Sequence, residues 1–382
     1  MINRKIVMIP GPTPVTRSIQ EAAGRETWAF GDPGFVKDYK GIIEDLKSLW
    51  RCDGQVFVVA GSGTLAMEMA IANNTKPGDN VLVISHGFFG DRFSDIARRK
   101  GLNVDLMQSE WGAIVPVAEI GKKLEEKQYA AVTATHVDTS TAVMAPIHEI
   151  GMAVKQKSPG AIYIVDGVAA TAGIDEDMEK SGIDVLLTGS QKAFGVPPGL
   201  AMVFANSRSL ARRAEAGETI PEYYVDYEKW LPVMDDPLKY FATPSVNLVW
   251  ALKEALEIIK HEGLDNRYAR HAKNGAAVAA ALETLGFTIL AEKPWRAPTL
   301  TTALYMDGVD DAKFRSVIQE EGVIVAGALG KYAGKAFRLG HMGNTDTHDL
   351  VCAIAAIERT LHRLNACVKL GSGVGALMER LV

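Results

Sequence analysis

The stretch D-V-L-L-T-G-S-Q-K-A-F-G-V-P-P-G, residues 184–199, joins an apolar strand to a polar turn and a loop rich in glycine and proline. The strand pattern ends at Thr188, and the turn then presents Gln191 and Lys192. Lysine is seldom buried unless it has a partner or a chemical role. At the end of a buried strand, it can act as an amine nucleophile toward an aldehyde cofactor. Taken alone, the stretch equally fits a lysine in an ordinary surface loop.

Around this stretch, short apolar segments alternate with helical patterns from residue 55 onward. Strands are expected at 56–59, 80–85, 130–135, 162–166, 185–189 and 199–205, and helices at 65–73, 89–100 and 147–157. This alternation predicts an α/β fold with a mostly parallel sheet and helices on both faces. Such sheets bind ligands beyond the carboxyl ends of their strands.

The pattern changes after residue 245, where a long helix leads into mixed helices and strands that predict an α+β domain. We therefore divide the chain into an N-terminal arm at 1–20, a large domain at 21–255 and a small C-terminal domain at 256–382. The glycine-rich G-S-G-V-G at 371–375 predicts a flexible break before a short amphipathic end.

Composition excludes several classes of protein. A net charge of -5 gives no basic excess for nucleic acid or an anionic membrane. The apolar runs are too short to cross a bilayer, and no signal peptide is expected because the N-terminus lacks an apolar core segment. The three cysteines show neither a disulfide framework nor a zinc pattern. They point to a reducing compartment, and we expect a cytoplasmic protein without a metal site.

A second chemical element is I-Y-I-V-D at residues 162–166. Asp166 ends a buried strand, so it is expected to face the ligand crevice. A carboxylate there can pair with a protonated pyridine nitrogen and keep the ring an electron sink. It could also cap the next turn or bind magnesium. One strand-to-strand excursion separates Asp166 from Lys192, which puts both at the same edge of the sheet.

A third element, V-V-A-G-S-G-T-L-A-M-E at residues 58–68, runs from a strand through a glycine-rich turn into a helix. The helix N-terminus at Ser62, Gly63 and Thr64 can bind a phosphate, although a simple strand–helix turn would read the same. Ala66 stands where the dinucleotide fingerprint needs its third glycine. A nucleotide-dependent dehydrogenase is therefore the weaker alternative.

Two further positions carry possible ligand contacts. In S-H-G-F-F-G-D-R-F at residues 85–93, Phe88 or Phe89 could stack on a flat ring or simply pack in the core. In F-R-L-G-H-M-G at residues 337–343, Arg338 could grip a carboxylate or form an interdomain salt bridge.

Together and in this order, these pieces resemble the class V aminotransferase family of fold-type I pyridoxal-phosphate (PLP) enzymes, particularly its alanine–glyoxylate and serine–glyoxylate branch. The resemblance runs from P-G-P-T-P at 10–14 to about residue 362. Its most specific part is S-Q-K-A-x-x-x-P-P-G at 190–199. T-H-V-D-T-S-T-A at 135–142 is similar to the family's H-x-E-S-S-T-G, and Y-F-A-T-P-S-V-N at 240–247 to its Y-x-x-T-P-P-V-N.

The resemblance implies a large domain with a seven-stranded, mostly parallel sheet, and PLP as cofactor. Lys192 would carry PLP as a Schiff base and shuttle the proton, Asp166 would bind the pyridinium, and Phe89 would stack on the ring. The phosphate would be contacted by Ser62, Gly63, Thr64 and Gln191. Thr139 would reach the ring hydroxyl region. Arg338 would bind the substrate carboxylate, with Gly11 near the substrate.

The resemblance also implies partners. Tyr240 and Thr243 would reach the phosphate of a second subunit, giving a homodimer with composite active sites. The expected reaction moves an amino group from serine or alanine to glyoxylate or pyruvate by ping-pong chemistry. Ureidoglycine–glyoxylate and aminoethylphosphonate–pyruvate transaminases, or a non-catalytic PLP-binding subunit, stay open.

Some positions depart from the family's pattern. Thr64 replaces a frequent histidine, Asp138 and Thr139 replace Glu-Ser, and Ala142 replaces the motif's last glycine. Gln191 before the lysine disfavours cysteine desulfurases and kynureninases, which usually carry histidine there. Substrate choice is expected to depend on side chains around Asp32, Phe35 and Phe241.

Overall fold

The computed structural model describes residues 5–382, so the first four residues of the expected N-terminal arm lie outside it. Its large sheet has seven strands in the order β2-β10-β9-β8-β5-β3-β4. These are β2 (Gln55–Ala60), β3 (Asn80–Ser85), β4 (Asn103–Gln108), β5 (Ala131–Thr135), β8 (Ile162–Asp166), β9 (Val185–Gly189) and β10 (Leu200–Ala205). β10 runs antiparallel to the other six strands, which are parallel to one another. The expected mostly parallel sheet is confirmed.

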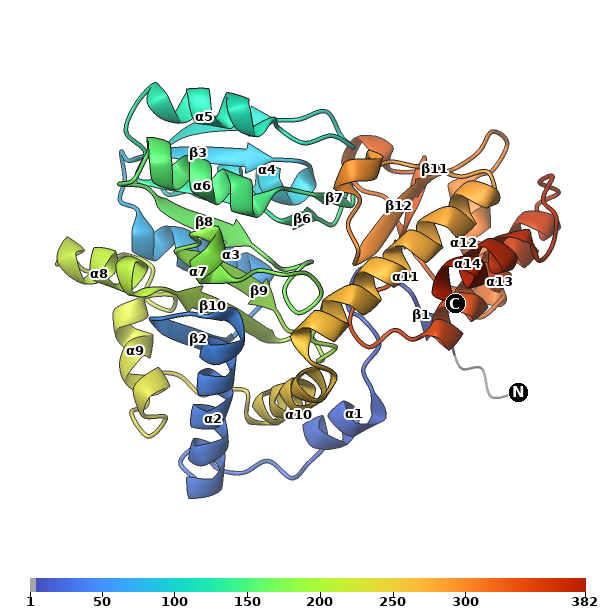
Figure 1. The fold of residues 1–382 in the computed structure, drawn as a ribbon. Helices are drawn as coiled ribbons and strands as arrows, with labels where there is room; N and C mark the ends of the chain where they lie inside the picture. The colour runs from blue at the N-terminus through green and yellow to red at the C-terminus, as the bar shows by residue number, and fades with distance from the viewer. Residues whose placement is uncertain (1–4) are drawn as a thin grey trace.

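Helices cover both faces of this sheet, with α5 and α6 in front of it and α3 and α4 behind in Figure 1. The helices of this part are α1 (Arg17–Ala23), α2 (Pro33–Trp50), α3 (Gly63–Asn74), α4 (Phe88–Arg99), α5 (Val117–Glu125), α6 (Ile147–Lys157), α7 (Met178–Ser181), α8 (Ser207–Ala216), α9 (Tyr227–Asp235) and α10 (Val246–Glu262). The central strands β5, β8, β9 and β10 are buried along their whole length. Burial on both faces explains why they are almost entirely apolar.

The C-terminal part is built on an antiparallel sheet in the order β11-β12-β15-β14. Its elements are α11 (Leu264–Thr284), β11 (Thr288–Ile289), β12 (Leu300–Leu304), α12 (Asp311–Glu320), β13 (Val323–Ile324), β14 (Ala326–Gly327), β15 (Ala336–Gly340), α13 (Thr347–Arg363) and α14 (Ser372–Leu381). It has its own hydrophobic cluster. The boundary expected at 255/256 stays a prediction and falls within α10, whose Ile259 still packs in the first cluster.

The first described residues join this smaller part. β1 (Ile6–Val7) pairs in parallel with β13, so the N-terminal arm starts there and then runs toward the large sheet. None of the helices in residues 5–382 is long and apolar enough to cross a membrane. The same residues contain no group of three or more histidine, cysteine or acidic side chains placed to hold a metal ion.

The expectation of a flexible break at residues 371–375 is wrong. Four of these residues begin α14, which packs along α11. The buried Glu358 carboxylate accepts hydrogen bonds from the backbone N–H groups of Gly371, Gly373 and Val374. A carboxylate at a helix N-terminus satisfies N–H groups that lack a partner within the helix. A distant glutamate therefore stabilises a start that the local sequence does not favour.

Candidate active site

Five loops leave the large sheet at one edge, where the strands β2, β3, β5, β8 and β9 end. Because these strands are parallel to one another, their carboxyl ends lie together. The loops carry most of the residues that the sequence marks as functional. These are Ser62, Gly63 and Thr64 after β2, Phe89 after β3, Thr139 after β5, Asp166 at the end of β8, and Gln191 and Lys192 after β9.

Lys192 lies beneath the N-terminal arm and is only 8% exposed. Its Nζ donates a hydrogen bond to the Pro10 carbonyl. Gly11 has a φ of +118°, and a Cβ there would approach the lysine's Cδ to 2.6 Å. Thr13 fixes the arm further, because its hydroxyl donates to the Lys192 carbonyl at 2.7 Å. Glycine at position 11 is therefore required both by backbone conformation and by the space that the lysine occupies.

The electrostatics of this amine favour its neutral form. Burial, together with the positive charge of Arg338, lowers the pKa of Lys192 to about 8, although Asp166 opposes the shift. A lysine with such a pKa is partly neutral near physiological pH, so it can act as a base or nucleophile.

Asp166 is buried beside this amine at the end of the neighbouring strand. Its Oδ1 accepts a hydrogen bond from the Val168 N–H at 2.9 Å. Burial raises the pKa of Asp166 to about 7, and the nearby carboxylates of Asp138 and Glu176 raise it as well. Among residues 5–382, no cation forms an ion pair with it within 4.0 Å. Its environment is thus suited to a cationic ligand group that would complete the pair.

The N-terminus of α3 forms a cradle next to these groups. Ser62 precedes the helix with no side-chain cap, and the first helical residues are Gly63 and Thr64. Their N–H groups have no carbonyl partner within the helix, which makes the position an anion site. A Cβ on Gly63 would come within 2.7 Å of a Val168 methyl group, so the loop after Asp166 packs directly against the cradle.

The start of α4 presents Phe89, and a buried aspartate fixes it there. Asp138 Oδ2 accepts hydrogen bonds from the N–H groups of Phe89 and Gly90 at 2.9 and 3.1 Å. Its Oδ1 accepts from the Ser140 hydroxyl at 2.6 Å. Burial raises the pKa of Asp138, and these hydrogen bonds oppose the shift. Asp138 thus caps α4 and sets the direction of the aromatic side chain.

Arg338 reaches the same region from β15. Its Nε donates to the Gly327 carbonyl at 2.9 Å and its Nη1 to the Thr139 carbonyl at 3.1 Å. It forms no ion pair with any residue of the described chain, so the alternative of an interdomain salt bridge is not what the structure contains. A half-buried guanidinium bonded only to carbonyls keeps its positive charge available for a carboxylate ligand.

Comparisons with known proteins agree with this arrangement. The family model "Aminotransferase class-V" matches residues 37–339. An uncharacterized aminotransferase of Methanocaldococcus jannaschii is 35% identical over 99% of this chain and 98% of its own length. The serine–glyoxylate aminotransferase of Hyphomicrobium methylovorum is 32% identical over 98% and 93%. The crystal structure of ureidoglycine–glyoxylate aminotransferase from Bacillus subtilis superposes with a TM-score of 0.94 at 26% identity, covering 99% and 98%.

The chain belongs to the class-V aminotransferase family. Enzymes of this family use PLP, and the residues of this chain fit such a group. A buried amine of lowered pKa, a buried carboxyl group without a cation and an open helix N-terminus lie at one sheet edge. In addition, the buried Gln191 Oε1 has no hydrogen-bond partner in the part of the chain that is described.

Two residues expected in a class-V aminotransferase site, Tyr240 and Thr243, have described contacts only with other parts of the chain. Tyr240 is 59% exposed, and its hydroxyl lies 3.2 Å from the Thr243 hydroxyl. Its ring packs on Phe30. No described hydrogen bond or ring contact joins either residue to the cradle of the same chain.

Other expectations within the class-V aminotransferase pattern receive structural explanations. Phe35 is fully buried against Tyr39 and Trp250, and Asp32 caps α2. These contacts stabilise the fold, and a role for the surrounding side chains in substrate choice stays a prediction. Ala142 has a φ of +60°, the left-handed region that glycine adopts freely. This explains why the corresponding motif usually ends in glycine.

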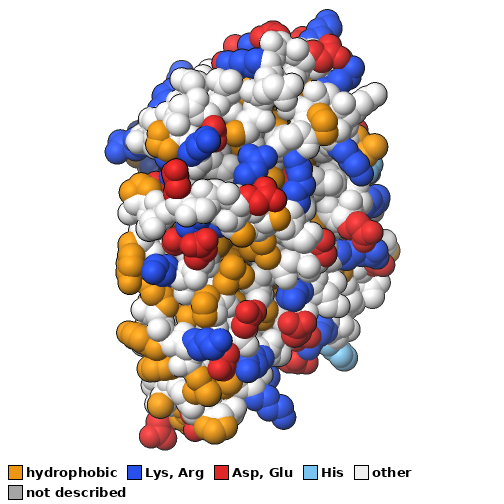
Figure 2. Space-filling model, turned by 90° about the vertical axis from the view of Figure 1, so that its left-hand side faces the viewer, with side chains coloured by type: hydrophobic (Ala, Val, Ile, Leu, Met, Phe, Trp, Pro, Cys, Tyr) orange, Lys and Arg blue, Asp and Glu red, His pale blue; other side chains and the backbone are white. Residues whose placement is uncertain are grey.

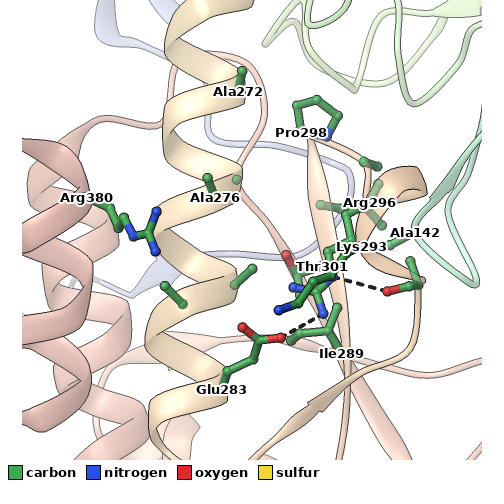
Figure 3. Close-up of a pocket in the computed structure, with 16 residues that line it drawn as sticks. Ala142, Ala272, Ala276, Glu283, Ile289, Lys293, Arg296, Pro298, Thr301 and Arg380 are labelled. Atoms are coloured by element: carbon green, nitrogen blue, oxygen red, sulfur yellow. Dashed lines mark hydrogen bonds and ion pairs between the residues drawn. The ribbon is translucent and has the colours of Figure 1, made fainter.

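A separate hollow of about 430 Å³ lies beside α11. Figure 3 shows Ala272 and Ala276 on the helix, with Lys293, Arg296 and Pro298 on the facing segment. Arg296 is paired with Glu283 at 2.7 Å. None of the residues predicted to bind the cofactor or substrate lines this hollow, so it is distinct from the class-V aminotransferase site.

Proposed function

We propose that this chain is a PLP-dependent aminotransferase that moves an amino group from serine or alanine to glyoxylate or pyruvate. The observation that carries the proposal is the pair formed by Lys192 and Asp166. Both are buried at the ends of the adjacent strands β9 and β8, and each has an incomplete set of partners. Buried ionisable groups with shifted pKa values and an unfilled partner are typical of catalytic sites.

Bound PLP supplies an aldehyde that condenses with an amine and a ring that accepts the electron pair of a broken bond. The protein's part is to hold charges and move one proton. Lys192 Nζ removes the substrate's α-proton and returns it, which its lowered pKa allows. Asp166 keeps the ring nitrogen protonated. A cation beside its carboxylate lowers the raised pKa of Asp166 again, so the two charges stabilise each other.

Arg338 orients the substrate by binding its α-carboxylate. Two of its N–H groups are held by the carbonyls of Gly327 and Thr139, which fixes the plane of the guanidinium. The same positive charge lowers the pKa of Lys192 and favours the neutral amine. One arginine therefore serves both binding and the protonation state of the base.

The choice of substrates rests on the relatives. Serine and glyoxylate are named for the Hyphomicrobium methylovorum enzyme, and glyoxylate for the Bacillus subtilis enzyme. Glyoxylate as acceptor is thus the shared element. The structural likeness to the second enzyme favours ureidoglycine–glyoxylate transfer as the alternative, and an aminoethylphosphonate–pyruvate transaminase or a non-catalytic PLP-binding subunit would keep the same cofactor residues.

Absorbance spectra of the purified protein test the proposal. We expect a cofactor band near the visible edge that Lys192→Ala removes. L-serine or L-alanine should convert the band, and glyoxylate should restore it. A band that neither donor shifts, but ureidoglycine or aminoethylphosphonate does, would change the substrate. A band that no donor shifts would indicate the non-catalytic subunit, and no band after incubation with PLP would refute the proposal.

We further propose a homodimer with composite sites, as expected for Tyr240 and Thr243. Large hydrophobic side chains are exposed on the same part of the chain, namely Trp28, Tyr223, Leu238 and Tyr240. On the face in Figure 2, hydrophobic side chains gather in the lower half, at the height of α2 and α9 in Figure 1. Contiguous exposed apolar surface is typical of subunit interfaces.

Mixing two inactive variants tests the composite site. In a heterodimer of Lys192→Ala and Tyr240→Ala chains, one site would combine the intact lysine of one chain with the intact tyrosine of the other. Random reassociation should therefore recover about a quarter of wild-type activity, since half the dimers carry one intact site. Recovery no higher than in either parent alone would place both residues in the same subunit's site.

A further inference from the structure

Arg92 joins two parts of the site that the sequence analysis treated separately. It lies on α4, one turn beyond the aromatic pair. Its Nη1 donates a hydrogen bond to the Thr64 hydroxyl at 2.9 Å. Its guanidinium carbon lies 4.8 Å from the ring centroid of Phe89 and 5.4 Å from that of Phe88. One side chain thus contacts both the phosphate cradle and the aromatic platform.

The positive charge of Arg92 is not neutralised by the chain. It forms no ion pair with any residue between 5 and 382. The adjacent Asp91 instead accepts hydrogen bonds from the Ser85 hydroxyl and the Gln108 amide. A guanidinium has five N–H donors, and the described contacts of Arg92 use one of them. The buried Arg213, by contrast, is paired with Asp226.

We propose that Arg92 is a cofactor-positioning residue that directs its charge to the phosphate end of PLP while holding the Phe89 ring in place. The proposal rests on the proposed cofactor. The α3 N-terminus offers backbone N–H groups, but a phosphate dianion at that helix needs more positive charge than a helix end provides. A guanidinium is well suited to phosphate because its planar N–H donors match two oxygens. The Thr64 hydroxyl keeps this guanidinium beside the cradle.

Binding of PLP and of pyridoxal, its analogue without phosphate, to the cofactor-free full-length protein tests the proposal. Arg92→Met should weaken PLP binding about tenfold or more, because charge-assisted hydrogen bonds to the phosphate are lost. Pyridoxal binding should change by less than about threefold, which is the share expected from the lost cation–π contact. Arg92→Lys keeps the charge without the fork and should recover part of the PLP affinity.

Two further variants sharpen the measurement. Thr64→Val removes the hydroxyl that holds Arg92, so it should weaken PLP binding, and its loss and that of Arg92→Met should be less than additive in a double-mutant cycle. Arg99→Met makes the same chemical change on the last turn of α4, where the arginine is exposed, and serves as the matched control. Far-ultraviolet circular dichroism and thermal unfolding check that each variant folds.

The outcomes separate this inference from the proposed function. Wild-type PLP affinity in Arg92→Met, or an equal loss of PLP and pyridoxal, would overturn the role at the phosphate. An unchanged PLP affinity with a raised KM only for donors that carry a second acidic group would assign Arg92 to the substrate instead. Failure of the wild-type protein to bind PLP would refute the proposed function itself.

Discussion

Two buried cations near the junction of the two sheets differ in how completely they are paired. Arg267 at the start of α11 donates to the carbonyls of Ala172 and Ala193 at 2.8 and 2.7 Å and pairs with Glu262 at 2.7 Å. Lys192 is the residue before Ala193, yet within residues 5–382 its Nζ has only the Pro10 carbonyl as a hydrogen-bond partner. The two side chains are thus neighbours in the fold, but Arg267 has several hydrogen-bond partners and Lys192 has few.

The difference separates a structural from a functional charge. Arg267 connects the loops after β8 and β9 to α11 and is paired with a carboxylate and with buried carbonyls, which is how proteins stabilise a buried charge. Lys192 and Asp166 keep shifted pKa values because burial is not compensated by partners. An incompletely satisfied buried group costs stability, so its presence indicates that a ligand completes it.

Replacing each cation by methionine should give opposite results, and the largest effect is expected at Lys192. Lys192→Met should lower aminotransfer activity by at least about a thousandfold, because the covalent anchor and the base are both lost. The cofactor-free variant should melt at the same temperature as the wild type or higher, since an uncompensated buried amine is removed. Steady-state assays and thermal unfolding measure the two effects. Activity within tenfold of wild type would remove Lys192 from the mechanism.

Arg267→Met should chiefly destabilise the fold. It leaves the carbonyls of Ala172 and Ala193 buried without donors, which we expect to cost about 3 kcal/mol of unfolding free energy. Denaturant unfolding measures this cost, and activity per folded molecule should fall far less than in Lys192→Met. Arg270→Met, on the same helix but half-buried, is the control with a smaller loss. Equal stability of Arg267→Met and wild type would contradict the structural role.

Asp166 should impose a pH dependence on the stability of the cofactor-free protein. Its folded pKa is raised from 3.8 to about 7, so the folded protein keeps a proton that the unfolded chain loses. This bound proton adds to the unfolding free energy below pH 3.8, the pKa in the unfolded chain. The contribution is lost as the pH rises through about 7, the pKa in the folded protein. Asp166→Asn does not titrate. Its unfolding free energy relative to wild type should therefore increase across this window, on the order of 3 kcal/mol, and then stay constant.

Unfolding at about pH 4.5, 6 and 7.5 would measure the Asp166 effect. A constant difference between the two proteins would show that the carboxyl group is not perturbed by burial. Adding PLP should reverse the trend in the wild type, because a cationic ring nitrogen lowers the pKa of the carboxyl group and turns its charge into a stabilising one.

Much of the fold, and the sheet edge that carries the candidate site, could be predicted from the sequence because the signals are local. Apolar runs mark the central strands, and polar or glycine-rich residues at their ends mark the edge where Asp166 and Lys192 meet. β4 was missed because it is an edge strand whose residues are half-buried or exposed, so it lacks a continuous apolar run. The placement of Tyr240 in a composite site is still a prediction.

The missed parts of the site depend on contacts between distant segments. Asp138 caps α4 from the short strand β6 (Val137–Asp138), 49 residues away from Phe89, and the Pro10 carbonyl meets Lys192 across 182 residues. The sequence around Arg92 predicts an ordinary helical arginine. Its hydrogen bond to Thr64 is what shows that it lies beside the N-terminus of α3. An arginine one turn after a candidate stacking aromatic would have been the available signal.

Arg338 lies between the paired Arg267 and the incompletely paired Lys192, because its described partners are two carbonyls and no carboxylate. Arg338→Met should raise the KM for amino and oxo acids by about 10- to 100-fold, the loss expected for a charge-assisted hydrogen bond to a carboxylate. Arg338→Lys should recover only part, because an ammonium cannot match both carboxylate oxygens. Arg315→Met, an arginine already paired with Asp311, should leave KM unchanged. If KM for the amino acid is also unchanged in Arg338→Met, the arginine belongs with Arg267 as a structural charge.

A second prediction for Arg338→Met concerns pH, because the positive charge of Arg338 lowers the pKa of Lys192. In Arg338→Met the pH at which the lysine becomes active should therefore move upward, which the pH profile of kcat/KM would detect.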